Sequence, residues 1–330
     1  MTLVDLWAAA LALSLLLYVL LDGFDLGVGM LFPLAPGEPA RRRMLAAISP
    51  VWDGNETWLV VAGATLFGAF PLVYATLLSA FYLPVIAMLA GLILRGVAFE
   101  FRYKTVRFRL LWDAGFVAGS TVATLVQGTM VGALVQGLPI VDGRYVGGPL
   151  GWLSPFALLC GVGLCLGYAL IGACWLVAKS EGEVREFAYR VLPWLLASLL
   201  AFLAAAFVYA VLIDLPVMRR WFERPSLVVL PVLGAVALAG LLRGIAVRND
   251  RLPFPMAALI FLAAFGTLAA SFLPYMVPFS ITIAEAAAPE SSLHFLFWGA
   301  GLFVFPITLA YTAAVYFIFR GKVAGEAEYE

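Results

Sequence analysis

Long apolar runs recur along this chain of 330 residues, and they constrain its fold more than any other feature. Hydrophobic residues make up 64% of the sequence and charged residues only 12%, about half the charged fraction of a typical soluble domain. A helix needs about 20 apolar residues to cross a hydrocarbon core of roughly 30 Å. The sequence therefore predicts an all-α polytopic membrane protein. Nine transmembrane helices are expected, near residues 3–22, 52–70, 74–95, 112–136, 152–177, 191–213, 226–247, 254–276 and 293–319.

The lysines and arginines are divided unevenly between alternate loops, and this division predicts the orientation. Basic residues are retained on the cytoplasmic side of bacterial-type membranes. The N-terminus should therefore face out and the C-terminus in, which requires an odd number of helices. No basic run suggests a nucleic-acid partner. The cytoplasmic set is Arg41, Arg42, Arg43, Arg95, Arg102, Lys104, Arg107, Arg109, Lys179, Arg185, Arg190, Arg243, Arg248, Arg251, Arg320 and Lys322, and the outer set is Arg144, Arg219, Arg220 and Arg224.

A short pattern occurs twice in the chain. Residues 83–85 and 94–98 resemble residues 230–232 and 242–246. The copies lie four predicted spans apart, an even number, so both copies cross the membrane in the same direction and the repeat is parallel. We expect two parallel-repeat four-helix bundles plus one additional helix. The predicted division is 1–140 for the first bundle with the acidic motifs, 141–250 for the first three helices of the second repeat, and 251–330 for its fourth helix, the ninth helix and a short cytoplasmic tail.

Two pairs of acidic residues interrupt the apolar pattern. Asp22 and Asp25 lie at the cytoplasmic end of the first predicted span, and Asp53 and Glu56 lie at the start of the second. Residues three apart share one face of a helix. Both pairs lie on the predicted cytoplasmic side, so we expect four carboxyl groups to converge there.

Placing an ionised carboxylate at bilayer depth costs up to about 3 kcal/mol on insertion scales. Such residues therefore usually face a protein interior or a water-filled path. Crowded carboxyls with little access to water can hold and exchange a proton near neutral pH. This chemistry suits a proton inlet, with Asp25 and Asp53 as its principal groups.

A structural interpretation of the same residues is also open, and for Asp22 it is the favoured one. Asp22 would pair with the loop arginines 41–43, and Asp53 would cap the second helix. The remaining motif residues would then serve close helix packing and an interfacial aromatic belt: Gly23, Gly27, Gly54, Trp52 and Trp58.

Histidine is nearly absent. His294 is the only one, so this chain cannot supply two axial histidines to a haem, and we expect it to bind no cofactor itself. The chain alone should not form a complete redox active site.

The segments around both acidic pairs resemble the two signatures of subunit II of cytochrome bd-type quinol oxidases. They are residues 21–29, Leu-Asp-Gly-Phe-Asp-Leu-Gly-Val-Gly, and residues 52–59, Trp-Asp-Gly-Asn-Glu-Thr-Trp-Leu. The similarity extends over nearly the whole chain. Residues 272–278 and 286–289 look closest to the cyanide-insensitive branch of the family.

The resemblance implies a haem-free subunit of a terminal oxidase in the bacterial cell inner membrane. A separate subunit I would bind haems b and d, oxidise quinol and reduce dioxygen to water with cytoplasmic protons. Further expected partners are a small accessory subunit, quinone and lipid. Subunit II would stabilise subunit I and contribute to a proton pathway, to which Asp25 and Asp53 correspond. Glu56 replaces the glutamine of other members, and would extend that pathway or tune it. The motifs are completed by Asp22, Gly23, Gly27, Trp52, Gly54, Asn55 and Trp58.

Two alternatives remain at this point. A secondary transporter with carboxylate-coupled transport would also place acids in helices, although its site usually lies at the midplane, between broken helices. A membrane scaffold would explain the missing cofactor ligands, but it would leave the acidic pairs unexplained.

Overall fold

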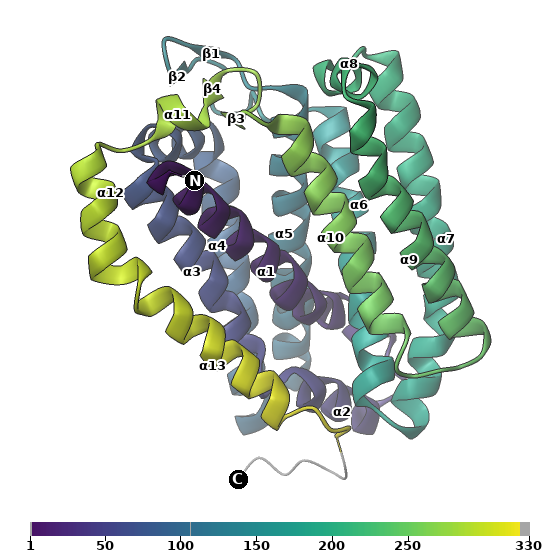
Figure 1. Ribbon diagram of the computed structural model, residues 1–330. Coiled ribbons are helices and arrows are strands. Elements are labelled where there is room, and N and C mark those ends of the chain that lie inside the picture. Colours follow the sequence, from purple (N-terminus) through teal and green to yellow (C-terminus); the bar gives the residue numbers. More distant parts are fainter. Residues whose placement is uncertain (1, 106, 324–330) are drawn as a thin grey trace.

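The computed structural model describes residues 2–105 and 107–323, without the side chains of residues 219, 222 and 223. The rest of the predicted cytoplasmic tail lies outside these ranges. The described chain is almost entirely helical (Figure 1). Its α-helices are α1 (Leu3–Leu31), α2 (Glu38–Ile48), α3 (Trp52–Ala69), α4 (Pro71–Lys104), α5 (Arg109–Gln136), α6 (Pro155–Lys179), α7 (Gly182–Leu212), α8 (Pro216–Glu223), α9 (Val229–Ala246), α10 (Pro253–Phe272), α11 (Ile283–Ala286), α12 (Glu290–Leu296) and α13 (Val304–Ile318).

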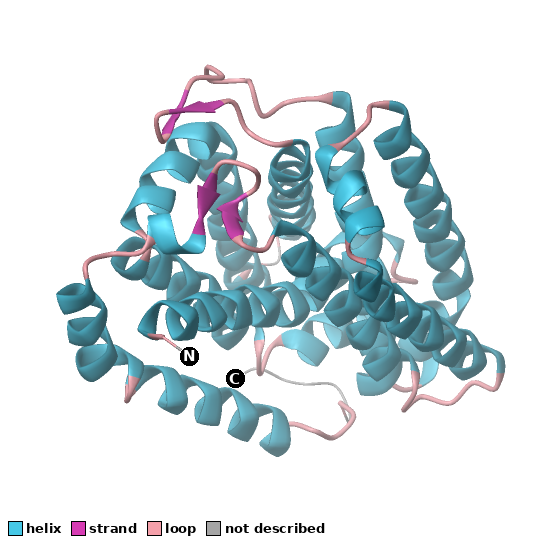
Figure 2. Ribbon diagram, turned by 45° about the horizontal axis from the view of Figure 1, so that its top comes forward, coloured by secondary structure: helices cyan, strands magenta, loops and turns pink. Residues whose placement is uncertain are grey.

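Short elements close the two ends of the bundle. The hairpins β1 (Ile140–Val141) with β2 (Arg144–Tyr145) and β3 (Tyr275–Val277) with β4 (Ile281–Thr282) lie near the N-terminus (Figures 1 and 2). Helix α2 lies at the opposite end of the bundle (Figure 1). The minor helical turns are η1 (Phe32–Leu34), η2 (Pro225–Val228) and η3 (Phe297–Gly301).

Eight helical segments within the described residues are long and apolar enough to cross a membrane, which confirms the all-α polytopic class. The eight segments do not include α3, the second predicted span. This helix has only 18 residues, and its first turn carries Asp53. The count of nine and the direction of insertion stay predictions.

Local sequence signals fix several helix starts. Thr2 caps α1 in a reciprocal box with Asp5, and Ser154 caps α6 ahead of Pro155. The first helix is longer than the predicted span, because it continues through Asp22 and Asp25 to Leu31. Both acidic residues are therefore internal to the helix and share one of its faces.

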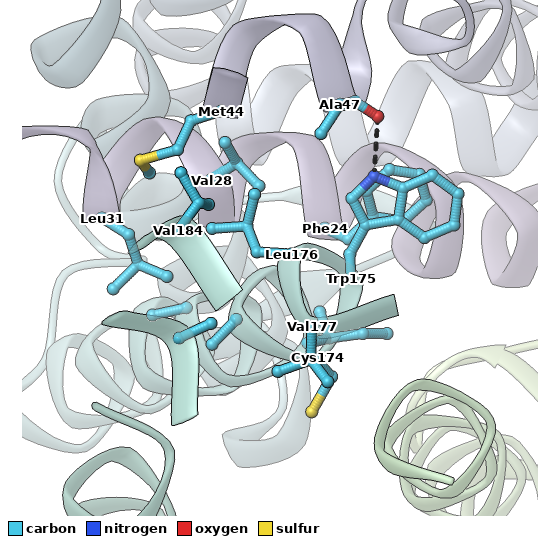
Figure 3. Close-up of a cluster of buried hydrophobic side chains, with 14 of the residues drawn as sticks. Phe24, Val28, Leu31, Met44, Ala47, Cys174, Trp175, Leu176, Val177 and Val184 are labelled. Atoms are coloured by element: carbon cyan, nitrogen blue, oxygen red, sulfur yellow. Dashed lines mark hydrogen bonds between the residues drawn. The ribbon is translucent and has the colours of Figure 1, made fainter. Parts of the chain in front are cut away.

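The centre of the molecule is a close crossing of α1 and α6. A Cβ atom added at Gly27 would lie 1.8 Å from the backbone oxygen of Tyr168, and one at Gly23 would lie 2.7 Å from the Tyr168 ring. Beside the crossing, Phe24 stacks on Trp175 with ring centroids 4.2 Å apart, and Trp175 Nε1 donates a hydrogen bond to the Ala47 carbonyl at 2.9 Å (Figure 3). The structure thus agrees with the close-packing interpretation of both glycines.

Substitution of Gly27 by alanine should destabilise this crossing by about 3 kcal/mol, because the added methyl group meets backbone that cannot rotate away. The melting temperature of the purified protein would measure the loss. Gly234→Ala in α9 is the matched control, since its Cβ would be 3.6 Å from Ala263, an ordinary contact. Equal melting temperatures for the two variants would contradict the close-packing role.

The packing of helices is compatible with the predicted repeat. In the first predicted copy, α1 contacts α3 and α4 contacts α5. In the second, the corresponding helices make the same contacts: α6 with α7, and α9 with α10. Helix α6 also packs on α1 and α5, so the two predicted bundles share one interior. The division at residues 140 and 250 remains a prediction.

None of the residues of helix α13 is buried, and its C-terminal end is held by charged contacts. Just beyond it, Lys322 contacts Asp250 at 2.7 Å, and Lys179 donates to the Phe319 carbonyl. Burial opposes ionisation of Asp250, but hydrogen bonds from Arg185, Lys322 and Tyr189 outweigh burial and lower the pKa of Asp250 to about 2. This charged contact docks the C-terminal segment and so positions the end of α13.

Candidate functional site

The acidic motifs of α1 and α3 meet at one arginine of α4. Nη2 of Arg95 lies 2.8 Å from Oδ1 of Asp22 and 3.0 Å from Oε1 of Glu56. Arg95 is 2% exposed and Asp22 is fully buried, whereas the Glu56 side chain is 25% exposed. The ring of Trp52 covers the guanidinium, with its centroid 5.9 Å away. Three helices therefore contribute to one buried ionic centre, which we call the acid cluster: Asp22, Asp25, Glu56 and Arg95.

Asp25 enters the acid cluster from the next turn of α1 and is held by Asn55. Nδ2 of Asn55 donates to Oδ2 of Asp25 at 2.7 Å and to the Leu21 carbonyl at 3.2 Å. The hydroxyl of Tyr316 donates to Oδ1 of Asn55 at 2.9 Å. Asp25 and Asn55 are buried and Tyr316 is half-buried, so this branch connects the acid cluster with α13.

A second polar branch lies one turn away on α1. Nε2 of Gln127 donates to the Tyr18 hydroxyl at 2.7 Å, and the Tyr168 hydroxyl donates to Oε1 of Gln127 at 3.3 Å. These groups are buried at the contact of α1, α5 and α6. Sequence inspection missed this branch, because its residues come from three separate spans and match no motif.

Charge is unbalanced inside the acid cluster. Three carboxyl groups face one guanidinium, and the side chains within the described residues leave Oδ1 of Asp25 without a hydrogen-bond partner. Buried ions need a compensating partner, and a carboxyl group can instead be neutralised by a proton. The arrangement is suited to holding at least one proton.

Three expectations about the acidic residues are wrong. Asp22 pairs with Arg95 rather than with the loop arginines 41–43, since Arg41 contacts Asp113 at 3.3 Å. Asp53 does not join the acid cluster, because its side chain is exposed on the outer face of α3. It does not cap α3 either, since the cap position is Val51. Three carboxyls converge, not four.

The tryptophans of the motifs have packing roles, whereas the close-packing role expected for Gly54 is wrong. Trp58 is fully buried against Phe305 and so is not part of an interfacial belt. Trp52 packs on Phe99 as well as on Arg95. A Cβ atom at Gly54 would only reach ordinary contact with Tyr311, at 3.7 Å.

A second ionic group continues along α4 towards the end of the bundle that carries α2. Arg102 is 2% exposed, contacts Asp113, and lies 2.8 Å from Oε2 of Glu38. Arg109 also contacts Glu38, at 3.3 Å. Arg102 is two turns beyond Arg95 on the same face of α4. Charged groups thus lead from the α2 end of the bundle towards the acid cluster.

Arg95 was not identified from the sequence as the partner of the acidic residues. It appeared as one of many cytoplasmic basic residues, and its repeat counterpart Arg243 is exposed. Its position within the predicted third span was the available signal, since a charge at that depth needs a partner.

The sequence contains a single histidine as a possible axial ligand of a haem. The side chain of its one histidine, His294, is 53% exposed and lies 3.7 Å from Glu290 on α12. Cys174 is buried in an apolar core, next to Trp175. An exposed histidine and a thiol enclosed by apolar side chains do not fit as ligands of a haem.

Comparisons with known proteins agree with the observed fold and motifs. Residues 3–319 match the family model described as cytochrome bd terminal oxidase subunit II. The chain is 33% identical to "Cytochrome bd-I ubiquinol oxidase subunit 2" of Escherichia coli K12, over 97% of this chain and 95% of that protein. It is 33% identical to "Probable cytochrome oxidase subunit 2" of Haemophilus influenzae, over 94% and 89%. The solved bd oxidase of Geobacillus thermodenitrificans has a chain with a TM-score of 0.78 and 18% identity, covering 97% of this chain and 98% of that one.

Proposed function

The chain belongs to the family of cytochrome bd terminal oxidase subunit II, and from this membership we propose that it stabilises a haem-bearing subunit I and conducts cytoplasmic protons towards it. Members are subunits of a quinol:oxygen oxidoreductase complex in the inner membrane, and the haems belong to that complex. Full-length membership leaves no ground for the secondary transporter.

The acid cluster is the observation that carries the proton proposal. It combines buried carboxyls with a single compensating guanidinium, which is an arrangement that can take up and release a proton without a large change in structure. It is reached from the surface through Glu56, whose side chain is partly exposed. Asp53, one turn earlier on α3, is exposed and is proposed as the entry group.

The proposed route runs from Asp53 to Glu56, and from there past Arg95 to Asp22 and Asp25. Arg95 positions Asp22 and Glu56 around one guanidinium, and Asn55 holds the Asp25 carboxyl by a single hydrogen bond. Asn55 occupies only Oδ2 of Asp25. When Asp25 is protonated on Oδ1, that hydroxyl can therefore donate a hydrogen bond to the next group of the route. Tyr316 is the polar group of α13 that contacts this branch, through Asn55.

The stabilising role is proposed from the outer faces of α3 and α13. Val60 and Phe67 on α3 and Ile307 and Phe317 on α13 are each more than 60% exposed. Such faces suit either lipid or a helical partner of similar polarity. We propose that subunit I covers part of them, with quinone, lipid or a small accessory subunit as further partners of the complex.

Substitution of Asp53 by asparagine should slow quinol-driven oxygen consumption by up to about tenfold, because an exposed carboxylate can be partly replaced by water as the entry group. The haem spectrum and the subunit ratio of the purified complex should be unchanged. Oxygen consumption at saturating quinol is the measurement.

Glu100→Gln is the matched control, since Glu100 is another exposed acidic residue, in the C-terminal part of α4. Unchanged turnover in a fully assembled Asp53→Asn complex would remove Asp53 from the route. Loss of haem in that variant would instead assign Asp53 a role in assembly.

A further inference from the structure

Two arginines at the N-terminal end of the bundle meet at one backbone oxygen. Arg220 lies on α8 and Arg224 directly follows this helix. Nη1 of Arg220 donates to the Leu273 carbonyl at 2.6 Å, and Nη1 of Arg224 donates to the same oxygen at 3.3 Å. The two Nη1 atoms are therefore within about 6 Å of each other, a separation at which like charges repel.

Only partial charges offset this pair of guanidinium groups. Arg220 also donates to the Ser271 and Phe272 carbonyls, which belong to the last turn of α10. The C-terminus of a helix carries about half a negative charge. The rings of Tyr275 and Phe279 flank the Arg220 guanidinium at 5.1 and 5.6 Å. No carboxylate among the described side chains forms an ion pair with either arginine. Residues 214–224 carry three arginines and two acidic residues, so the formal charge of this segment is +1.

The apolar surroundings of the pair place it where phospholipid headgroups lie. Helix α7 ends just before α8, and α9 begins just after Arg224. Leu212 at the end of α7 is 77% exposed, and Val229 at the start of α9 is 69% exposed. Exposed apolar helix ends below a charged loop mark the boundary between acyl chains and headgroups.

The position of these arginines is unusual for a membrane protein. The predicted orientation places this end of the bundle outside, where basic residues are rare. Of the four basic residues predicted there, Arg219, Arg220 and Arg224 lie within one short segment, although the Arg219 side chain is outside the described residues. Helix α8 also lies across the molecule from α12 and α13 (Figure 1), so subunit I on the α13 face would leave it accessible.

We propose that Arg220 and Arg224 bind the phosphate of an anionic phospholipid headgroup, whose acyl chains lie along the exposed ends of α7 and α9. Guanidinium groups form charge-assisted hydrogen bonds with phosphate oxygens, often two at a time. The backbone carbonyls of α10 and Leu273 hold the Arg220 guanidinium in place, which reduces the entropy lost on binding. This inference is independent of the proton route.

Native mass spectrometry of the purified, delipidated oxidase complex would test the site. Phosphatidylglycerol, phosphatidylcholine and inorganic phosphate would each be titrated against the wild-type complex. The wild-type complex should bind phosphatidylglycerol more tightly than phosphatidylcholine. The double variant Arg220→Gln/Arg224→Gln should raise the Kd for phosphatidylglycerol about tenfold or more.

The single variant Arg224→Gln guards against loss of folding, because Arg220 keeps its bonds to α10. It should raise the Kd by a smaller factor while retaining the wild-type haem content. Arg144→Gln, which removes another exposed arginine of the same end, should leave the Kd unchanged. The proposal is overturned if the double variant binds phosphatidylglycerol like the wild type, or if phosphatidylcholine binds equally well. Displacement by inorganic phosphate at equal concentration would also overturn it, since the ligand would then be a free anion.

Discussion

Replacement of Arg95 by glutamine should abolish assembly of a stable oxidase complex. Arg95 is 2% exposed and is the one guanidinium that contacts Asp22 and Glu56 in the acid cluster. Removal of one partner from a buried ion pair costs about 3–5 kcal/mol, because the remaining charge is left uncompensated. That cost is a large share of the total stability of a typical domain. The expected result is little complex in the membrane, measured as haem and subunit content after purification.

The repeat supplies the matched control for this experiment. Arg243 stands at the equivalent place in α9, follows the same short sequence pattern, and is exposed. Arg243→Gln should therefore leave the yield and the melting temperature of the complex close to wild type.

A second variant separates charge imbalance from lost packing. If uncompensated charge is the cause, Arg95→Gln combined with Asp22→Asn should recover part of the yield, since both members of the buried pair become neutral. Wild-type amounts of complex from Arg95→Gln alone would contradict the account of the acid cluster as a compensated ionic centre.

Replacement of Asp25 by asparagine should stop most oxygen reduction while the complex still assembles. Asp25 is fully buried, and its only described hydrogen bond is the one that it accepts from Asn55. Asparagine keeps the shape of the side chain and lacks an exchangeable acidic proton. Because no water-exposed group can substitute at this depth, we expect turnover to fall about a hundredfold or more. Oxygen consumption at saturating quinol, normalised to haem content, is the measurement.

Asn55→Asp and Tyr316→Phe help to interpret this loss. Tyr316→Phe removes only the hydroxyl that contacts Asn55 at 2.9 Å, so it should reduce turnover much less than Asp25→Asn. Asn55→Asp places a fourth carboxyl beside the cluster and should lower the melting temperature instead, through like-charge repulsion. Normal turnover by an assembled Asp25→Asn complex would exclude Asp25 from the proton route.

The helical architecture could be predicted well from the sequence, because the length and polarity of each span follow from the thickness of the bilayer. Each predicted span overlaps one observed helix or helical segment, and the errors lie at the ends. Helix α1, predicted to end at Asp22, continues to Leu31, and α4, predicted to end at Arg95, continues to Lys104. Polar and charged residues ended the predicted spans, because hydropathy alone treats them as exposed. In the structure these residues pair with one another, and the helices extend past the point where their apolar character ends.

The candidate site was predicted only in part. The spacing of Asp22 and Asp25 correctly placed both on one helix face, because a three-residue separation fixes that geometry locally. The same rule could not show that Asp53 turns outward while Asn55 and Glu56 turn inward, since the rotation of α3 depends on the helices packed around it.

The sequence by itself determined that this chain is a membrane protein built of helices, and its motifs identified the family. Those properties depend on composition and on local spacing, which the chain carries in any conformation. Only the tertiary structure decided that Arg95 compensates Asp22 and Glu56, and that Gln127 and Tyr316 extend the polar branches around them. These partners come from helices far apart in the sequence. Their contacts exist only when these helices pack against one another.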